Sequence, residues 1–102
     1  MAPQPANRLE LIARASQIEP LRHTPAGLPI ARAWLEHQGQ VNEAGVPRQV
    51  CFGVQAVALG ALAQQLAETT DGTLLQVSGF LAPLRQGSDR LVLHIQQFAE
   101  AL

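Results

Sequence analysis

The sequence is poor in cysteine, in charged residues and in long apolar runs. The single cysteine, Cys51, cannot form an internal disulfide, which fits a reducing compartment such as the cytoplasm. No apolar run approaches the ~20 residues that a membrane helix needs, and the first residues lack the basic and apolar segments of an export signal. We therefore expect a cytoplasmic protein that makes no contact with a membrane.

The length and composition indicate one folded domain. The chain has 102 residues, of which 47% are apolar and only 15% charged, so it can build one modest core. Its formal net charge of −1 argues against a strong, purely electrostatic grip on phosphates. We expect a flexible tail over residues 1–6 and a single domain over residues 7–102.

The segment from Arg22 to His37 reads as a loop that stiffens into a strand. Pro25 suits the second position of a turn, and Pro29 suits the first residue of a strand. From there, alternation puts one set of side chains inward (Ala31, Ala33, Leu35, His37) and another outward (Ile30, Arg32, Trp34, Glu36). An outward Trp34 beside a cation could hold a nucleic acid; the alternative, equally compatible with the spacing, is an edge strand whose Trp34 packs against a partner subunit.

The remaining periodicity predicts four more strands and one helix. Strands are expected at 7–15, 29–38, 48–55, 73–83 and 90–98, a helix at 56–70, and loops at 39–47 and 84–89. Three strands, a helix and two strands is the order of an OB-fold, a five-stranded Greek-key barrel. The predicted fold class is therefore all-β with one helix between the third and fourth strands.

Several single residues carry further expectations. In the strand at 48–55, Val50, Phe52 and Val54 should share the buried face. Gly79 lies inside a strand and suggests a bulge. Ile12 falls on the otherwise polar face of the first strand, and a dimer contact would explain it.

No constellation of residues indicates an enzyme. Alternation places His37 on the face opposite Cys51, so the two cannot act as a catalytic pair. The three histidines and the cysteine lack zinc-ligand spacing, and the glycines form no phosphate loop. We expect no catalytic residue, no metal site and no cofactor.

Taken in order, several short motifs resemble the primosomal replication protein N (PriB) family over roughly residues 7–98. The motifs are Asn7-Arg8-Leu9, Pro25-Ala26-Gly27-Leu28-Pro29, Leu35-Glu36-His37, Glu43-Ala44-Gly45, Arg48-Gln49, Val77-Ser78-Gly79-Phe80 and Leu91-Val92-Leu93-His94. The resemblance implies a homodimer of OB-folds, related to bacterial single-strand-binding protein, that binds single-stranded DNA. It also implies work in replication restart beside the PriA helicase and other primosome proteins.

The sequence departs from that family's pattern at its expected DNA contacts. Cys51 stands where a base-stacking aromatic is found, Gln38 replaces an arginine, and the loop at 84–89 is shorter and less basic. A stacked base contributes ~1–3 kcal/mol, so weak binding is expected unless another aromatic replaces the missing one. The expected DNA-binding residues are Arg22, Arg32, Trp34, Arg48, Phe80, Arg85 and Arg90.

Two other functions remain open. One is a primosome adaptor that contacts proteins and has little DNA affinity. The other is a general single-strand-binding protein, although that resemblance would imply a long tail with an acidic tip, which this sequence lacks.

Overall fold

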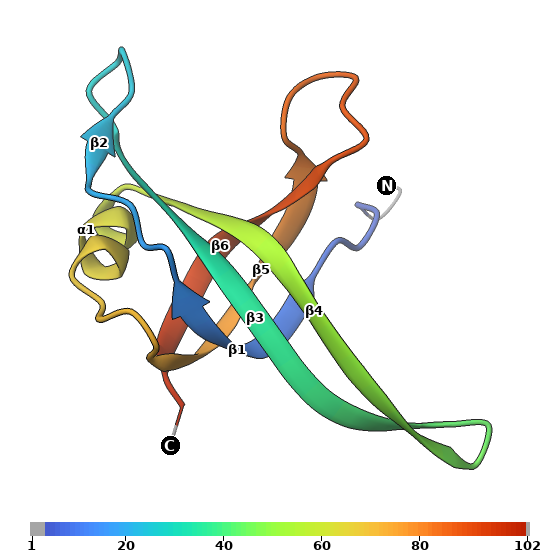
Figure 1. Cartoon of the computed structure of the whole chain (residues 1–102). Helices are drawn as coiled ribbons and strands as arrows, with labels where there is room; N and C mark the ends of the chain where they lie inside the picture. The colour runs from blue at the N-terminus through green and yellow to red at the C-terminus, as the bar shows by residue number, and fades with distance from the viewer. Residues whose placement is uncertain (1–3, 102) are drawn as a thin grey trace.

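The computed structural model describes residues 4–101 and contains six strands and one helix (Figure 1). The elements are β1 (Leu9–Ser16), β2 (Arg22–His23), β3 (Pro29–Glu43), β4 (Val46–Leu59), α1 (Ala61–Ala67), β5 (Leu74–Pro83) and β6 (Leu91–Glu100). The tail expected at residues 1–6 lies partly outside the described residues, and residues 4–8 form no regular element. No helix within residues 4–101 is long and apolar enough to cross a membrane.

Five of the strands close into a barrel. The sheet runs β1-β5-β6-β4-β3-β2, and an additional pairing of β1 with β3 closes the ring. All of these pairings are antiparallel except the one between β4 and β6, which is parallel. The two-residue β2 adds an edge to β3 outside the closed ring. The OB-fold prediction is confirmed, with β2 as an extra element that the sequence pattern did not reveal.

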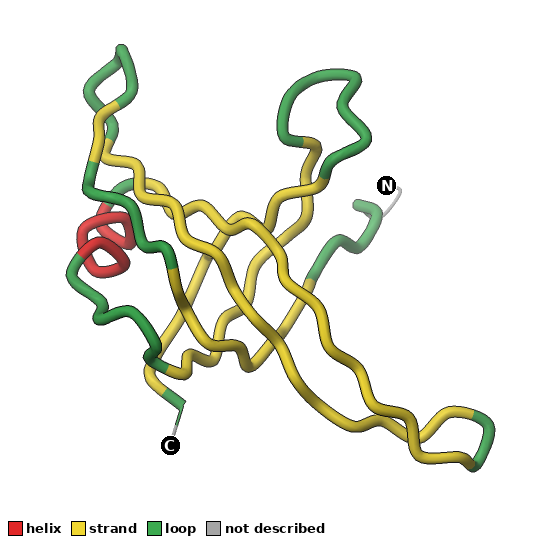
Figure 2. Tube along the Cα trace, viewed as in Figure 1, coloured by secondary structure: helices red, strands yellow, loops and turns green. Residues whose placement is uncertain are grey.

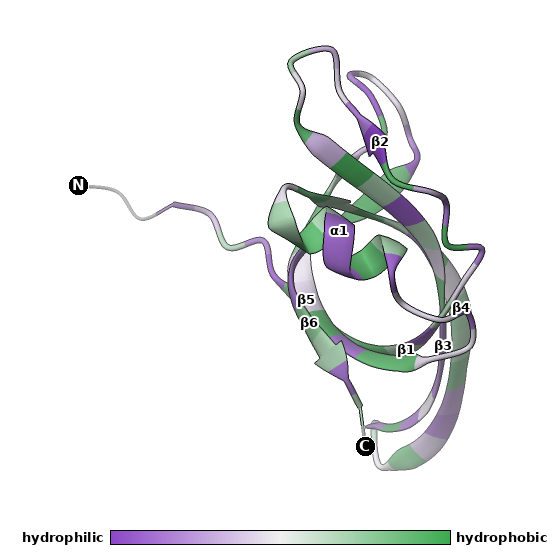
Figure 3. Cartoon of the chain, turned by 90° about the vertical axis from the view of Figure 1, so that its left-hand side faces the viewer, coloured by the Kyte–Doolittle hydropathy of each residue, from purple (hydrophilic) through white to green (hydrophobic). Residues whose placement is uncertain are grey.

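Small side chains fill the barrel interior. The buried alanines are Ala13, Ala15, Ala31, Ala33, Ala56, Ala58 and Ala63, and the largest fully buried side chains are Leu35, Leu66, Leu75, Leu93 and Val77. Within residues 4–101 no polar or charged side chain is buried. Alternating burial along β3 confirms Ala31, Ala33 and Leu35 of the predicted inward set, whereas His37 is only half-buried. The small side chains let the strands curve tightly around a narrow core. Helix α1 lies across one end of the barrel and packs against β3, β4 and β6 (Figure 3).

The predicted loop at 39–47 is wrong. Strands β3 and β4 stay paired from Ile30–Leu59 in the barrel wall out to Glu43–Val46. The outer part of this hairpin projects from the barrel, and we call it the arm (Figure 2). Ala44 and Gly45 make a two-residue turn in which both residues have positive φ, 52° and 80°. That geometry matches the right-handed twist of a hairpin, so the ladder continues to the tip.

The predicted helix at 56–70 begins too early. Ala56, Val57 and Ala58 belong to β4, where all three are buried. Their alanine content favours a helix locally, but pairing with β3 on one side and β6 on the other overrides that preference. Gly60, with φ of 74°, turns the chain before the helix starts.

Two predictions about single side chains in strands have different outcomes. Phe52 is 40% exposed rather than buried, because at this point β4 has left the barrel and its inward side has no core to cover. Gly79 lies at a bulge, where the register between β5 and β6 shifts after Ser78. A Cβ on Gly79 would lie 1.9 Å from the carbonyl oxygen of His94, so the strands approach too closely there for any side chain.

Candidate nucleic-acid interface

Strand register aligns four residues in a row on the outer side of the barrel, of which Val57 is only 7% exposed. Arg32 on β3 pairs with Val57 on β4, Val57 pairs with His94 on β6, and His94 pairs with Phe80 on β5. Paired residues in a sheet point to the same side, so the row forms one continuous surface. We call this surface, together with the adjoining outward residues Trp34 and Gln55, the aromatic face.

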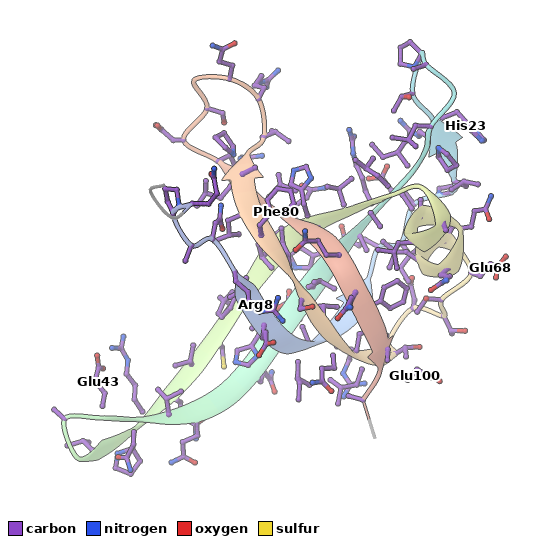
Figure 4. All side chains as sticks on the ribbon, turned by 180° about the vertical axis from the view of Figure 1, so that it is seen from behind. Arg8, His23, Glu43, Glu68, Phe80 and Glu100 are labelled. Atoms are coloured by element: carbon purple, nitrogen blue, oxygen red, sulfur yellow. The ribbon has the colours of Figure 1, made fainter. Side chains whose placement is uncertain are left out.

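A parallel ring pair forms one end of the row. The rings of Phe80 and His94 stack with centroids 4.9 Å apart and planes 8° from parallel. Phe80 lies on β5 and is half-buried. Figure 4 shows it far from Glu43, which marks the tip of the arm. The expected role of Phe80 as a stacking residue therefore has a partner ring beside it.

Trp34 is held on the same face by its neighbours. A Cβ built on Gly53 would lie 2.2–2.6 Å from three atoms of the indole, so the ring lies directly over the Gly53 backbone. The indole Nε1–H donates a hydrogen bond to Oε1 of Glu36 at 2.6 Å. Gln55 is the cross-strand partner of Trp34, and Glu36 is the partner of Gly53. Trp34 is thus a fixed, half-buried ring.

Two loops border the aromatic face. They rise on either side of it, one carrying β2 and the other connecting β5 to β6 (Figure 1). The second loop contributes Leu84 to a hollow shared with Arg32 and His94, and Arg90 to a hollow shared with Trp34. Arg32 therefore shares a hollow with His94, and Arg90 shares one with Trp34, so cations lie beside rings on one surface. Proteins that bind single-stranded nucleic acid combine these two kinds of group.

The predicted arginines fall into two groups. Arg32, Arg85 and Arg90 are exposed and take part in no ion pair within residues 4–101. Arg22 also borders the face but lies 3.8 Å from the carboxylate of Glu19. By contrast, Arg48 pairs with Glu43 at 2.7 Å on the opposite side of the arm. Of the other expected residues, Arg32, Trp34, Phe80 and Arg90 lie on or beside the aromatic face, Arg22 shares a hollow with Arg32, and Arg85 lies in the loop between β5 and β6.

Sequence reasoning missed three residues of this surface. His94 enters the sequence analysis as one of three histidines without zinc-ligand spacing, and Glu36 as an outward residue with no assigned role. Gln55 is not among the residues expected to be buried and carries no predicted role. Alternation could have placed all three, but their neighbours on other strands depend on register, which no local pattern gives.

Neither catalytic nor metal-binding geometry is visible in residues 4–101. His37 contacts the ring of Phe52, with centroids 5.2 Å apart, and its Nδ1–H donates to the carbonyl oxygen of Ile12 at 2.8 Å. Cys51 is exposed on the other side of the same hairpin. No group of three or more histidine, cysteine or acidic side chains in the described part could hold a metal ion.

Comparison with known sequences places this surface in a family. Residues 7–97 match a family described as "Another single-strand binding protein family". Over 91 residues the chain is 53% identical to replication restart protein PriB of Bordetella pertussis, covering 89% of this chain and 85% of the relative. The chain belongs to the PriB family of replication restart proteins.

Solved structures agree with the sequence match. PriB from Ralstonia solanacearum superimposes with a TM-score of 0.87 at 38% identity, covering 96% of this chain and 100% of that one. Single-stranded DNA binding protein from Thermus aquaticus superimposes with a TM-score of 0.74 at 22% identity, over 95% of this chain and 50% of that one. The second likeness concerns the fold alone.

Proposed function

We propose that this protein binds single-stranded DNA across the aromatic face and acts as an accessory protein of replication restart in the bacterial cytoplasm. The observation that carries the proposal is the continuous row of Arg32, Val57, His94 and Phe80, with Trp34 beside it. Rings stack on bases of any sequence, and arginines neutralise phosphates. The names of the family's relatives support the restart role. No step of this function needs catalysis, a metal or a cofactor.

The affinity for single-stranded DNA should be low for a single-strand-binding protein. Three arginines near the face are free of ion pairs, whereas Arg22 has Glu19 nearby. The position expected to carry an aromatic holds Cys51, which is exposed on the arm. Trp34 on the neighbouring strand takes the place of that aromatic ring. Because it is the only tryptophan in the chain, its fluorescence reports DNA binding at this site directly.

A fluorescence titration with oligo-dT at low and moderate salt tests the proposal. Base stacking should quench Trp34 emission in a saturable manner, and the apparent affinity should fall as salt rises. If the emission and the hydrodynamic size stay unchanged at all DNA concentrations, the aromatic face is not a DNA-binding site.

We further propose that two copies pair along β1. Residues Leu9 to Arg14 pair with β5 on one side. The pairing with β3 involves only Arg14 to Ser16, so among residues 4–101 the other edge of Leu9 to Ala13 has no strand partner. Ile12 lies in this open part and is 48% exposed. An open edge with an apolar side chain favours self-association across a two-fold axis.

Contact with the PriA helicase is also part of the proposal, and the arm offers a surface for it. Val41, Val46 and Phe52 are 51%, 61% and 40% exposed on the side of the arm opposite Trp34. An apolar side of this kind suits a protein partner and leaves the aromatic face free for DNA. Replacing Val41 and Val46 by serine should weaken helicase binding and leave the oligo-dT affinity unchanged.

The second candidate function is a primosome adaptor without useful DNA affinity. The exposed apolar side of the arm and the net charge of −1 favour it. Under this reading the helicase would bind normally while the oligo-dT titration would show no quenching. The two measurements together separate the candidates.

A further inference from the structure

The carboxylate of Glu36 lies beside the indole of Trp34. Glu36 is exposed, and its Oε1 accepts the indole N–H at 2.6 Å. Within residues 4–101 its other oxygen, Oε2, has no hydrogen-bond partner, and Glu36 takes part in no ion pair. Across the strand from it, Arg14 donates instead to the carbonyl oxygen of Gly72 at 2.6 Å. A charged acceptor is thus held next to an aromatic platform.

The negatively charged carboxylate of Glu36 is unusual on a surface proposed to bind the phosphates of DNA. A carboxylate repels the backbone of DNA, so it weakens binding unless it contacts a base. The position of Glu36 is fixed by the hydrogen bond to Trp34, and Trp34 is fixed by the close approach to Gly53. A base stacked on the indole would therefore present its edge to a preoriented acceptor.

Bases differ in what they offer a carboxylate. Guanine presents two neighbouring donors, N1–H and N2–H, on its Watson–Crick edge, whereas thymine presents one donor between two carbonyl oxygens that a carboxylate repels. Cytosine and adenine each offer one amino group beside an acceptor. The chemistry of the acceptor therefore ranks guanine first and thymine last.

We propose that Trp34, Glu36 and Gly53 form a base-reading site that prefers guanine, with the indole as platform and the Glu36 carboxylate as reader. Arg90 and Gln55 line the hollow beside Trp34 and complete the site, Arg90 for a phosphate and Gln55 for a further hydrogen bond. The inference rests on the proposed DNA-binding function and adds a base preference to it. A preference of about five- to tenfold for a guanine-containing strand is expected.

The experiment compares three oligonucleotides of equal length, about 16 nucleotides, which is enough to cover an OB-fold. One is oligo-dT, one alternates thymine with guanine, and one alternates thymine with hypoxanthine, which lacks the N2 amino group of guanine. Affinities come from Trp34 fluorescence. We expect the strand with guanine to bind most tightly, the strand with hypoxanthine next and oligo-dT least.

Glu36→Gln is the decisive variant. Its amide oxygen can still accept the indole N–H, but the amide has no charge and presents donors to the base. The preference for guanine should then disappear or reverse toward thymine. Glu68→Gln removes the same charge at the end of α1 and should keep the preference. Matching melting temperatures show that both variants are folded.

The outcomes separate the two proposals. Equal affinities for the three strands, or a guanine preference that survives Glu36→Gln, would overturn the base-reading site and leave DNA binding intact. Absence of binding to every strand would overturn the proposed function and the base-reading site with it.

Discussion

The indole of Trp34 lies directly over the backbone of Gly53, two strand positions from its direct cross-strand partner Gln55. Three indole atoms occupy the space that any Cβ at Gly53 would need, at 2.2–2.6 Å. The position of the ring therefore depends on the absence of a side chain on the neighbouring strand.

Replacing Gly53 with alanine should displace the ring. The added methyl group overlaps the indole, and the resulting strain should lower the free energy of unfolding by about 1–3 kcal/mol. Urea unfolding measures the loss, and a shift of the Trp34 emission maximum reports the movement. A double-mutant cycle with Trp34→Ala is the control, because the penalty should largely vanish once the indole is removed. An unchanged penalty in the double mutant would mean that the clash lies elsewhere.

Trp34→Ala should weaken oligo-dT binding by ~1–3 kcal/mol while the fold and the self-association persist. Fluorescence anisotropy of a labelled oligonucleotide measures the affinity, since the reporter tryptophan is gone. The alternative role, an anchor between subunits, predicts instead that subunit dissociation and melting temperature change together. Sedimentation of the same variant decides between the two roles.

The salt dependence of binding should be shallow. Each phosphate neutralised on a single strand contributes about −0.7 to the log-log slope, so three or four arginine contacts give a slope of roughly −2 to −3. Removing Arg85 and Arg90 together should flatten the slope by about 1.4 without changing stability. Arg48→Ala is the comparison, and it should change the slope less because Glu43 already pairs with Arg48. A wild-type slope much steeper than expected would indicate further basic contacts.

Ile12→Glu should weaken self-association. Two carboxylates would face each other across the two-fold axis in place of two apolar side chains, at a cost of about 2 kcal/mol or more. Analytical ultracentrifugation should give about twice the monomer mass for the wild type at micromolar concentration and a monomer for the variant. Gln96→Glu introduces the same charge on β6 and should leave the dimer intact. A wild-type monomer at this concentration would remove the dimer from the proposal.

Ala44→Asn should stabilise the arm. Ala44 has a positive φ of 52° at the first turn position, where its methyl group is unfavourable and asparagine followed by glycine is preferred. The free energy of unfolding should rise by about 1 kcal/mol, measured from the urea midpoint at constant slope. Val46→Asn places the same residue beyond the turn and should give no gain.

The sequence predicted which side chains share a face but not how far each strand extends. Alternation is a local property, so it correctly placed Trp34 outward and Leu35 inward. The length of the arm depends on pairing between residues far apart in sequence, and neither Gly39 nor Pro47 ended the ladder as their types suggested. The early start predicted for α1 has the same origin, because contacts with β3 and β6 decide the conformation of Ala56.

In the candidate site, too, local pattern predicted which residues face outward but not which side chains contact each other. Arg32, Trp34 and Phe80 could be named from their types and their places in the alternating pattern. That Phe80 stacks on His94, or that Glu36 holds the indole, depends on register and on side-chain conformation. No single stretch of the sequence carries that information.

The continuous ladder of the arm has a mechanical consequence. Fourteen successive residue pairs join β3 to β4 without a bulge, from Ile30–Leu59 to Glu43–Val46. The tip is therefore joined to the barrel wall by an unbroken series of paired residues. The same two strands carry Trp34, Glu36 and Gly53 nearer the barrel. A partner bound at the tip would thus be connected, through one continuous ladder, to the surface on which a base would stack.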